Sequence, residues 1–199
     1  SAGRQPMDPT GDRRRGDVEM KPWFTVGNVP GDRTLAQQMV GLGRLMKAVP
    51  GKTVLDCGCA QGLISIEMAR AGAKYVHGVE ILQPFVDTAW QQAGEMENIG
   101  FERGDMNVWQ APWQFDVVTA LAILQKLRDP CAVASMLADT AREMIVIRTP
   151  PGKDPWTLPP ERGRTVPHNI GAVLRGRGWK LSEQLAGTFG EVIGYWERA

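Results

Sequence analysis

Several features that would assign this sequence to a class at once are missing from it. No run of about 18 apolar residues occurs, as a membrane-spanning helix requires. The three cysteines, Cys57, Cys59 and Cys131, are an odd number without metal-binding spacing, so we expect reduced thiols and no metal. The formal net charge of +1 gives no global attraction to nucleic acid. We therefore expect a cytoplasmic protein with no membrane partner.

The length of 199 residues with 43% hydrophobic content suits one domain with a buried core and is short for two. Residues 1–20 hold glycines, prolines and the run Arg13-Arg14-Arg15, with almost nothing to bury. We expect them to form a flexible arm; a nucleic-acid-binding arm is the alternative, which the interspersed acids weaken. Residues 21–199 are assigned to a single domain, as a monomer or a homodimer.

Residues 53–62, Thr-Val-Leu-Asp-Cys-Gly-Cys-Ala-Gln-Gly, are the most informative stretch. The apolar start indicates a buried strand, and a helical pattern begins at Leu63. Gly58 and Gly62 bracket a turn where a missing Cβ lets the backbone approach a ligand. A second strand is predicted over residues 74–79, and Glu80 follows it, 18 residues beyond Gly62. That spacing places a carboxylate at a neighbouring strand tip, where it can accept both hydroxyls of a ribose.

The glycine spacing bears on which nucleoside cofactor is bound. A dinucleotide site has a Gly-x-Gly-x-x-Gly turn, whereas this turn reads Asp-x-Gly-x-x-x-Gly, beginning at Asp56. A carboxylate at the strand tip repels a diphosphate and suits a cationic ligand. S-adenosylmethionine carries a sulfonium and an ammonium group and no phosphate, so it fits better. A nucleotide site and a plain structural turn remain the alternatives.

These residues resemble motif I of the class I S-adenosylmethionine-dependent methyltransferases, and Glu80 resembles their motif II acid. Gly104-Asp105-Met106, after the third predicted strand, resembles the adenine-binding motif of the same superfamily. The resemblance implies S-adenosylmethionine as the cofactor and the tip of the fourth strand as the segment that faces the methyl group. The cofactor-binding residues that it implies are Asp56, Gly58, Cys59, Ala60, Gln61, Gly62, Glu80, Ile81, Asp105, Met106 and Ala120.

The rest of the pattern alternates strands with helices. Helices are predicted over residues 34–49, from Pro84, from Asp129-Pro130 and after Asn169, and strands over 99–103, 115–121, 144–147, 179–185 and 192–196. Residues 148–167, with six prolines, are expected to be an irregular connection. Such alternation predicts an α/β, Rossmann-like fold, a mainly parallel sheet with helices on both faces. The resemblance implies seven strands in the order 3-2-1-4-5-7-6, with strand 7 antiparallel.

Motif IV and its neighbours bear on the acceptor. The tetrapeptide of DNA amino-methyltransferases is absent, and Pro130-Cys131 lies in a helix start without the context of a cytosine C5 nucleophile. Residues 116–130, 65–73 and 23–26 resemble small-molecule methyltransferases and the enzymes that modify wobble uridine in tRNA. In that group a Tyr-His or His-His pair is usual where this sequence has Gln125-Lys126. The expected base is therefore missing.

Few side chains remain as catalytic candidates. His168 and Lys126 are the two weak ones, as a base or a substrate contact; a loop histidine and a solvated lysine are the alternatives. His77, inside a strand, is expected to be packed. Trp23-Phe24 either closes over the pocket or docks on the core. Residues 148–180 carry seven Lys or Arg against two acids, which favours an RNA or acidic substrate, or only a solvated loop.

We therefore predict an S-adenosylmethionine-dependent methyltransferase that acts on a small molecule or on RNA. The alternative is a non-catalytic S-adenosylmethionine-binding protein, a sensor or a partner subunit, because the expected base is missing. A nucleotide-dependent oxidoreductase is a third possibility, disfavoured by Asp56 and the glycine spacing.

Overall fold

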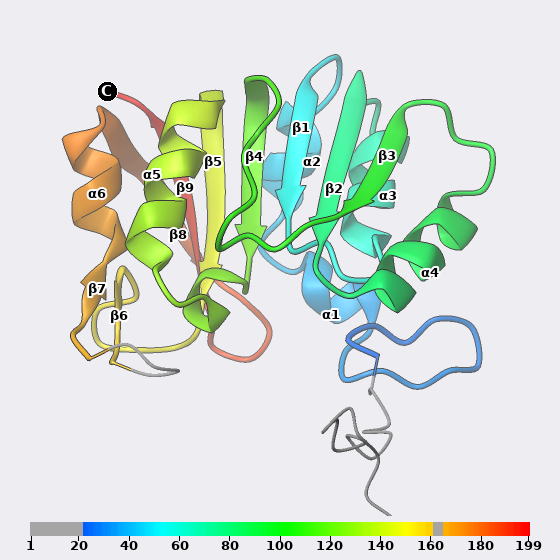
Figure 1. Cartoon of the computed structure of the whole chain (residues 1–199), viewed down its shortest axis with the longest axis horizontal. Coiled ribbons are helices and arrows are strands. Elements are labelled where there is room, and N and C mark those ends of the chain that lie inside the picture. The colour runs from blue at the N-terminus through cyan, green and yellow to red at the C-terminus, as the bar shows by residue number, and fades with distance from the viewer. Residues whose placement is uncertain (1–21, 161–164) are drawn as a thin grey trace, which may run out of the picture.

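A single seven-stranded sheet forms the centre of the protein, with helices packed on both faces (Figure 1). The computed structural model describes residues 22–160 and 165–199, so the expected arm over residues 1–20 lies outside the described residues. The strands are β1 (Thr53–Cys57), β2 (Tyr75–Glu80), β3 (Ile99–Arg103), β4 (Phe115–Leu121), β5 (Ala141–Thr149), β8 (Trp179–Ala186) and β9 (Val192–Arg198). In the described part of the chain, no helix combines the length and the apolar character needed to cross a membrane.

The strand order is β3-β2-β1-β4-β5-β9-β8. The strands β1 to β5 pair in parallel, whereas β9 is antiparallel to both β5 and β8. The predicted order and the antiparallel seventh strand are thus confirmed. Because the order reverses between β1 and β4, the carboxyl ends of these strands border a crevice in which α/β sheets bind ligands.

The helices are α1 (Leu35–Met39), α2 (Gly43–Ala48), α3 (Leu63–Arg70), α4 (Gln83–Ala93), the 3-10 helix η1 (Leu124–Lys126), α5 (Pro130–Thr140) and α6 (Ile170–Gly176). Their starts follow local sequence signals. Thr34 and Gln37 form a capping box at α1, and the side chains of Asp129 and Asn169 accept backbone N–H groups at the starts of α5 and α6. Pro84 and Pro130 occupy first-turn positions, where no N–H is needed.

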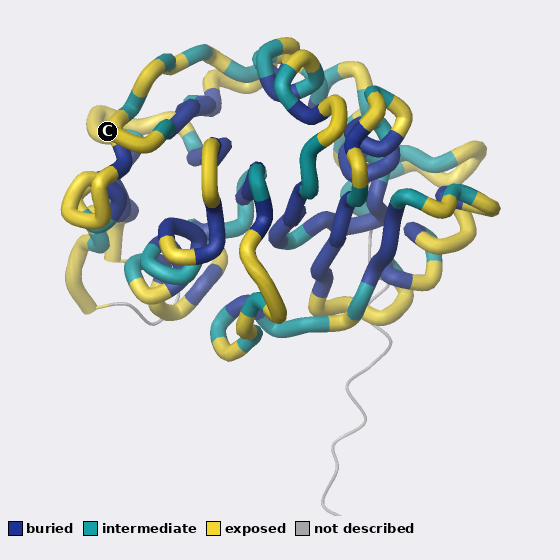
Figure 2. Tube along the Cα trace, turned by 90° about the horizontal axis from the view of Figure 1, so that it is seen from above, coloured by how far each residue is buried: buried dark blue, intermediate teal, exposed yellow. Residues whose placement is uncertain are grey.

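Two apolar layers hold these helices on the sheet. Residues of α2, α3 and α4 pack on one face, and residues of α5 and α6 pack on the other. Figure 2 shows that the buried segments follow the strands while exposed residues follow the outer turns. The central strand β4 is buried along most of its length, as expected for a parallel strand covered on both faces, whereas the edge strand β8 alternates buried or half-buried residues with exposed ones.

The predicted single helix over residues 34–49 is wrong, because the chain breaks between α1 and α2. Gly41 lies there with φ +80, a conformation that a helix cannot contain. A Cβ at this position would stand 2.4 Å from Ile193 Cδ1 of β9. The glycine therefore lets the segment dock closely on the last strand, at the expense of a continuous helix.

The predicted irregular connection over residues 148–167 also differs. Arg148 and Thr149 belong to β5, and the short strands β6 (Thr157–Leu158) and β7 (His168–Asn169) pair antiparallel in a second small sheet. Arg148 is only 2% exposed, and its guanidinium donates to the side-chain and backbone oxygens of Gln38. Arg148 is thus a buried residue, and it does not belong to a basic surface.

Candidate active site

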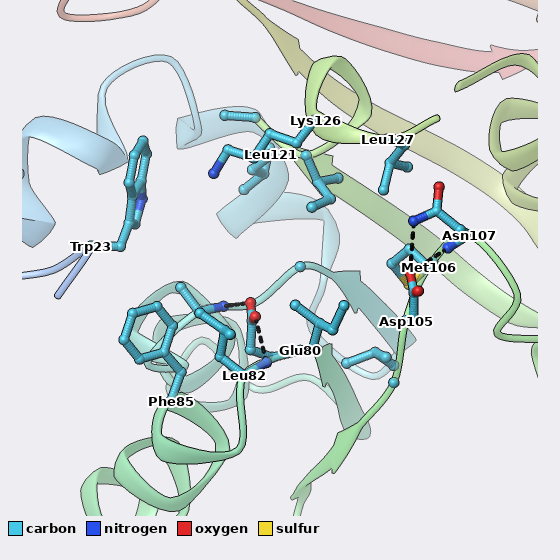
Figure 3. Close-up of a pocket in the computed structure, with 17 residues that line it drawn as sticks. Trp23, Glu80, Leu82, Phe85, Asp105, Met106, Asn107, Leu121, Lys126 and Leu127 are labelled. Carbon is cyan, nitrogen blue, oxygen red and sulfur yellow. Dashed lines mark hydrogen bonds between the residues drawn. The ribbon is translucent and has the colours of Figure 1, made fainter. Parts of the chain in front are cut away.

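A cavity of about 310 Å³ lies at the carboxyl ends of the central strands (Figure 3). Its wall comes from Trp23 and from four connections: Gly58 and Ala60 after β1, residues within 79–85 at the end of β2, residues 104–107 after β3 and residues within 121–127 at the end of β4. This position is the one at which doubly wound sheets bind ligands. Its volume is at the lower end of the range for small-molecule sites, about 300 to 1,000 Å³.

Glu80 is the acid at the end of β2, and only 8% of it is exposed. Its Oε2 accepts a hydrogen bond from the Ala60 N–H at 3.0 Å, and its Oε1 accepts one from the Leu82 N–H at 3.0 Å (Figure 3). These two bonds come from two different connections and hold the carboxylate against the cavity. A carboxylate oxygen has acceptor sites for more than one donor. Glu80 can therefore receive a pair of vicinal hydroxyls without leaving its backbone partners.

Asp105 lies on the neighbouring wall, after β3. Its Oδ1 accepts from the backbone N–H of Asn107 at 2.9 Å and from Asn107 Nδ2 at 2.8 Å. Asn107 in turn accepts from the Arg128 N–H at 3.0 Å, which ties this loop to the segment before α5. The second oxygen, Oδ2, takes no part in those bonds. It can therefore accept a hydrogen bond from an amine such as the exocyclic amine of adenine.

Two alanines in the cavity wall have left-handed backbone conformations. Ala60 has φ 50 and Ala122 has φ 65, and no other non-glycine residue of the described chain has a positive φ. A Cβ makes this region unfavourable by roughly 1 to 2 kcal/mol. Such strain concentrates at ligand sites, where the surrounding structure enforces it. The surrounding structure thus holds the turns after β1 and after β4 in backbone conformations that are unfavourable for an alanine.

Motif I implies that Asp56 contacts the cofactor, but its side chain is buried behind the cavity wall. Its carboxylate is 3% exposed and accepts hydrogen bonds from Ser65 Oγ at 2.5 Å and from Thr119 Oγ1 at 2.7 Å. Burial raises the pKa of Asp56, and the two hydroxyl donors oppose that rise. The side chain joins β1 to α3 and β4 and borders a small adjoining cavity of about 20 Å³ with Gly58 and Cys59. It does not line the main cavity.

The structure separates the predicted cofactor residues into two groups. Gly58, Ala60, Glu80, Ile81, Asp105 and Met106 line the main cavity. Asp56, Cys59, Gln61, Gly62 and Ala120 do not line it, and of these Asp56 and Cys59 border the small adjoining cavity. The missing Cβ of Gly62 makes room for packing, since a Cβ there would stand 2.7 Å from both Ala89 Cβ and Phe101 Cζ. Ala120 is fully buried in β4.

For Trp23 and Phe24 the sequence allows either closure over the pocket or docking on the core, and each residue follows one of these alternatives. Trp23 lines the cavity, and Phe24 is 2% exposed within the core. The Lys126 Nζ lies 4.5 Å from the centroid of the Trp23 ring, within range of a cation–π contact (Figure 3). Of the two catalytic candidates, only Lys126 lines the cavity; the His168 Nδ1 lies 3.6 Å from Asp129 Oδ1.

The packed interpretation of His77 is confirmed. It is 9% exposed and lies 3.3 Å from a Glu102 oxygen, with its ring beside Trp109 and Trp113. Sequence reasoning missed other wall residues, among them Leu82, Phe85, Asn107, Ile123 and Leu127. Most are apolar loop residues, and the only signal for them is their position after strands whose ends were recognised.

Comparison with known proteins agrees with this geometry. Residues 54–143 match the family model described as "Methyltransferase domain". The ubiquinone biosynthesis O-methyltransferase of Neisseria meningitidis serogroup C (strain 053442) is 32% identical over 96 residues, which are 46% of this chain and 40% of that protein. The chain thus matches about two fifths of the length of that relative.

Solved structures with the same fold cover most of the chain. The magnesium protoporphyrin IX methyltransferase of Synechocystis PCC 6803, with bound S-adenosylmethionine, aligns with a TM-score of 0.66 and 23% identity over 82% of this chain and 80% of that one. The N-methyltransferase NodS of Bradyrhizobium japonicum WM9, in complex with S-adenosyl-L-homocysteine, aligns with a TM-score of 0.67. Its sequence is 15% identical, and the alignment covers 82% of this chain and 86% of that one. With the strand order, these likenesses show that the chain has the fold of S-adenosylmethionine-dependent methyltransferases, and residues 54–143 match a methyltransferase domain.

Proposed function

We propose that this chain binds S-adenosylmethionine in the main cavity and transfers its methyl group to a small molecule, with residues 21–199 folded as one catalytic domain. The observation that carries the proposal is the position of Glu80, which two backbone N–H groups hold at the wall of the cavity. A fixed carboxylate beside a glycine turn suits a ribose, and the sheet edge suits a nucleoside.

The residues of the wall divide the work of holding the cofactor. Glu80 accepts hydrogen bonds from the ribose hydroxyls, and Asp105 accepts one from the adenine amine. The turn through Gly58 and Ala60 forms the part of the wall that contacts the ligand after β1. When bound, S-adenosylmethionine supplies a methyl group on a sulfonium, which a nucleophile displaces in line. The protein then mainly has to align the acceptor and keep water out.

The acceptor side of the cavity is largely apolar. Leu121, Ile123 and Leu127 line it, and Trp23 stands opposite Lys126. Lys126 is the one basic side chain in the wall as described, and no histidine or tyrosine lines it. This composition favours a flat, mainly apolar acceptor, whose nucleophilic group lies near Lys126. A Lys126→Met variant should keep cofactor affinity and lose most methyl transfer, whereas Lys126→Arg should lose transfer only if the lysine acts as a base.

The positions of four of the seven basic residues within 148–180 favour a small molecule over RNA. Arg148 is buried, and Arg175, Arg177 and Lys180 lie where α6 ends and β8 begins. Because β8 runs in the same direction as β1, this region lies at the sheet edge opposite the cavity (Figure 1). A strand of RNA that entered the cavity would not follow these charges.

Cofactor binding is tested by calorimetry and by thermal shift. Ligand that binds only the folded state raises the melting midpoint, so S-adenosylmethionine or S-adenosylhomocysteine should raise it and NAD should not. Glu80→Ala should weaken binding by about 1.5 to 3 kcal/mol, since it removes charge-assisted hydrogen bonds. Glu95→Ala, an exposed acid after α4, is the matched control. A shift with NAD alone, or equal affinity in the Glu80 variant, contradicts the proposed site.

A non-catalytic S-adenosylmethionine-binding protein is the second candidate, favoured by Gln125-Lys126 in place of a Tyr-His or His-His pair. Methyl-labelled cofactor incubated with a cell extract separates the two. Transfer of label to a small-molecule fraction supports the enzyme, and label that ribonuclease releases would identify an RNA acceptor instead. Binding without any transfer would leave the binding protein as the function.

A further inference from the structure

Three side chains with different metal-binding atoms meet outside the cavity. Asp129, Cys131 and His168 each offer one such atom, and these atoms all lie within 4.8 Å of one another. The Asp129 Oδ1 and the His168 Nδ1 are 3.6 Å apart. Cys131 lies in the first turn of α5, while His168 belongs to β7, so the cluster exists only in the folded chain.

The local structure holds these residues in place before any ligand binds. Asp129 caps α5, with Oδ1 accepting from the Ala132 N–H at 2.9 Å. Asn169, directly after His168, caps α6 by accepting from the Ala172 N–H at 2.7 Å. His168 also pairs with Leu158 of β6, and its side chain is only 18% exposed. Preorganised ligands lose less conformational entropy when they bind an ion.

The donor set and its spacing suit zinc. Thiolate, imidazole and carboxylate are the three ligand types of protein zinc sites, with bonds of about 2.0 to 2.3 Å. A tetrahedron with such bonds separates neighbouring donors by roughly 3.3 to 3.8 Å. The 3.6 Å between Asp129 and His168 already agrees with this range, and the widest separation needs a closure of only about 1 Å by side-chain rotation. We propose that Asp129, Cys131 and His168 form a Zn²⁺ site with a fourth, open coordination position.

A metal at this point would connect two parts of the fold. It would link the start of α5 to the small β6–β7 sheet and the start of α6 (Figure 1). Asp129 follows Leu127 by two residues, and Leu127 lines the main cavity. The ion would therefore brace the acceptor side of that cavity. This inference does not depend on the proposed function, since metal binding is measured without cofactor or acceptor.

The wild-type protein provides the first test. After treatment with a chelator, it should bind one Zn²⁺ per chain in calorimetry, and Co²⁺ should give a near-ultraviolet thiolate-to-cobalt band. Cys57 and Cys59 are buried, so a thiol reagent added to the native protein reports on Cys131. Zn²⁺ should slow that reaction at least tenfold. Failure to bind, a missing cobalt band or an unprotected thiol would each overturn the proposal.

Variants then identify the ligands. Cys131→Ser and His168→Gln should each weaken Zn²⁺ binding more than about 100-fold, because even losing an outer partner of a metal ligand weakens it about 10- to 100-fold. Asp129→Asn keeps the helix cap and removes the carboxylate, so it should weaken binding without unfolding α5. Asp139→Asn, an exposed acid of the same helix, is the control. Unchanged affinity in Cys131→Ser would refute the site, and an unchanged midpoint of urea denaturation without metal in each variant shows that the fold is intact.

Discussion

The side-chain amide of Gln61 forms two hydrogen bonds with the backbone of Phe24. Its Oε1 accepts from the Phe24 N–H at 3.0 Å, and its Nε2 donates to the Phe24 carbonyl at 3.1 Å. Gln61 belongs to the turn after β1, whereas Phe24 follows Trp23 of the cavity wall. The turn and the wall segment are therefore ordered together, although 37 positions separate them.

A Gln61→Met variant tests this link. The substitution keeps the volume and leaves the Phe24 N–H and carbonyl without their partners, which costs about 1 to 3 kcal/mol for each buried group. We expect lower stability to urea, faster amide exchange over residues 22–33 and several-fold weaker binding of S-adenosylhomocysteine. Gln91→Met, on the exposed side of α4, should change none of these. Unchanged exchange over residues 22–33 would show that Gln61 does not hold the segment.

Gly62→Ala should destabilise the protein strongly. The residue has φ +76, and its new Cβ would meet Ala89 and Phe101 at 2.7 Å. Backbone strain and overpacking add to about 3 kcal/mol. Gly51→Ala is the matched control, because it has φ +73 but nothing within 4 Å of its Cβ, so it carries only the strain of about 1 to 2 kcal/mol. Equal losses in the two variants, measured by urea denaturation, would mean that close packing at Gly62 has no role.

Gln38 and Arg148 should be energetically coupled. Burial lowers the pKa of Arg148 and makes its charge expensive to hold, while Gln38 provides two acceptors. Gln38→Leu removes the side-chain acceptor, which should cost about 1.5 to 3 kcal/mol for a bond to a charged group. The double variant with Arg148→Met should be at least about 1 kcal/mol more stable than Gln38→Leu alone, because it no longer buries a charge that has lost its side-chain acceptor. A double-mutant cycle from urea denaturation measures the coupling, and simple additivity would contradict it.

Asp116 should make stability depend on pH. Partial burial works to raise the pKa of this carboxyl, but the backbone N–H and hydroxyl of Thr53, together with Arg142, outweigh it and hold the pKa below its ordinary value. The stabilisation is therefore complete above the ordinary value of 3.8 and disappears as the pH falls through the lower native value. Asp116→Asn should lower the free energy of unfolding by about 1 kcal/mol at pH 7. This difference between the wild type and the variant should become smaller in acid. A stability difference between the wild type and Asp116→Asn that does not change with pH would contradict the assignment.

Local patterns were enough to predict the central strands and the place of the cavity. The bounds of β3 and β4 are those predicted: β3 ends directly before the turn signal Gly104-Asp105, and β4 is marked by its apolar run. The packing roles of Asp56 and Gly62 could not be predicted, because they depend on partners that the fold brings from other elements, such as Thr119 and Phe101.

Long-range contacts also explain the other differences. The break between α1 and α2 follows from the approach of Ile193, a residue of the last strand, to Gly41. Two-residue strands such as β6 and β7 have no periodicity to detect, and Arg148 has the sequence context of a loop. The meeting of Cys131 with His168 follows from the pairing of β6 with β7, and no spacing in the sequence indicates it.

The docking of the segment before β1 on β9 has a consequence for the order in which the protein matures. Arg33 pairs with Glu191, the Tyr195 hydroxyl donates to the Gly41 carbonyl, and Arg44 pairs with Glu197. A ribosome makes residues 22–49 early and residues 191–198 late. The contacts of Arg33, Gly41 and Arg44 with residues 191–197 can therefore form only after the far end of the described chain has emerged, so the docking of this segment on the sheet is completed late in synthesis.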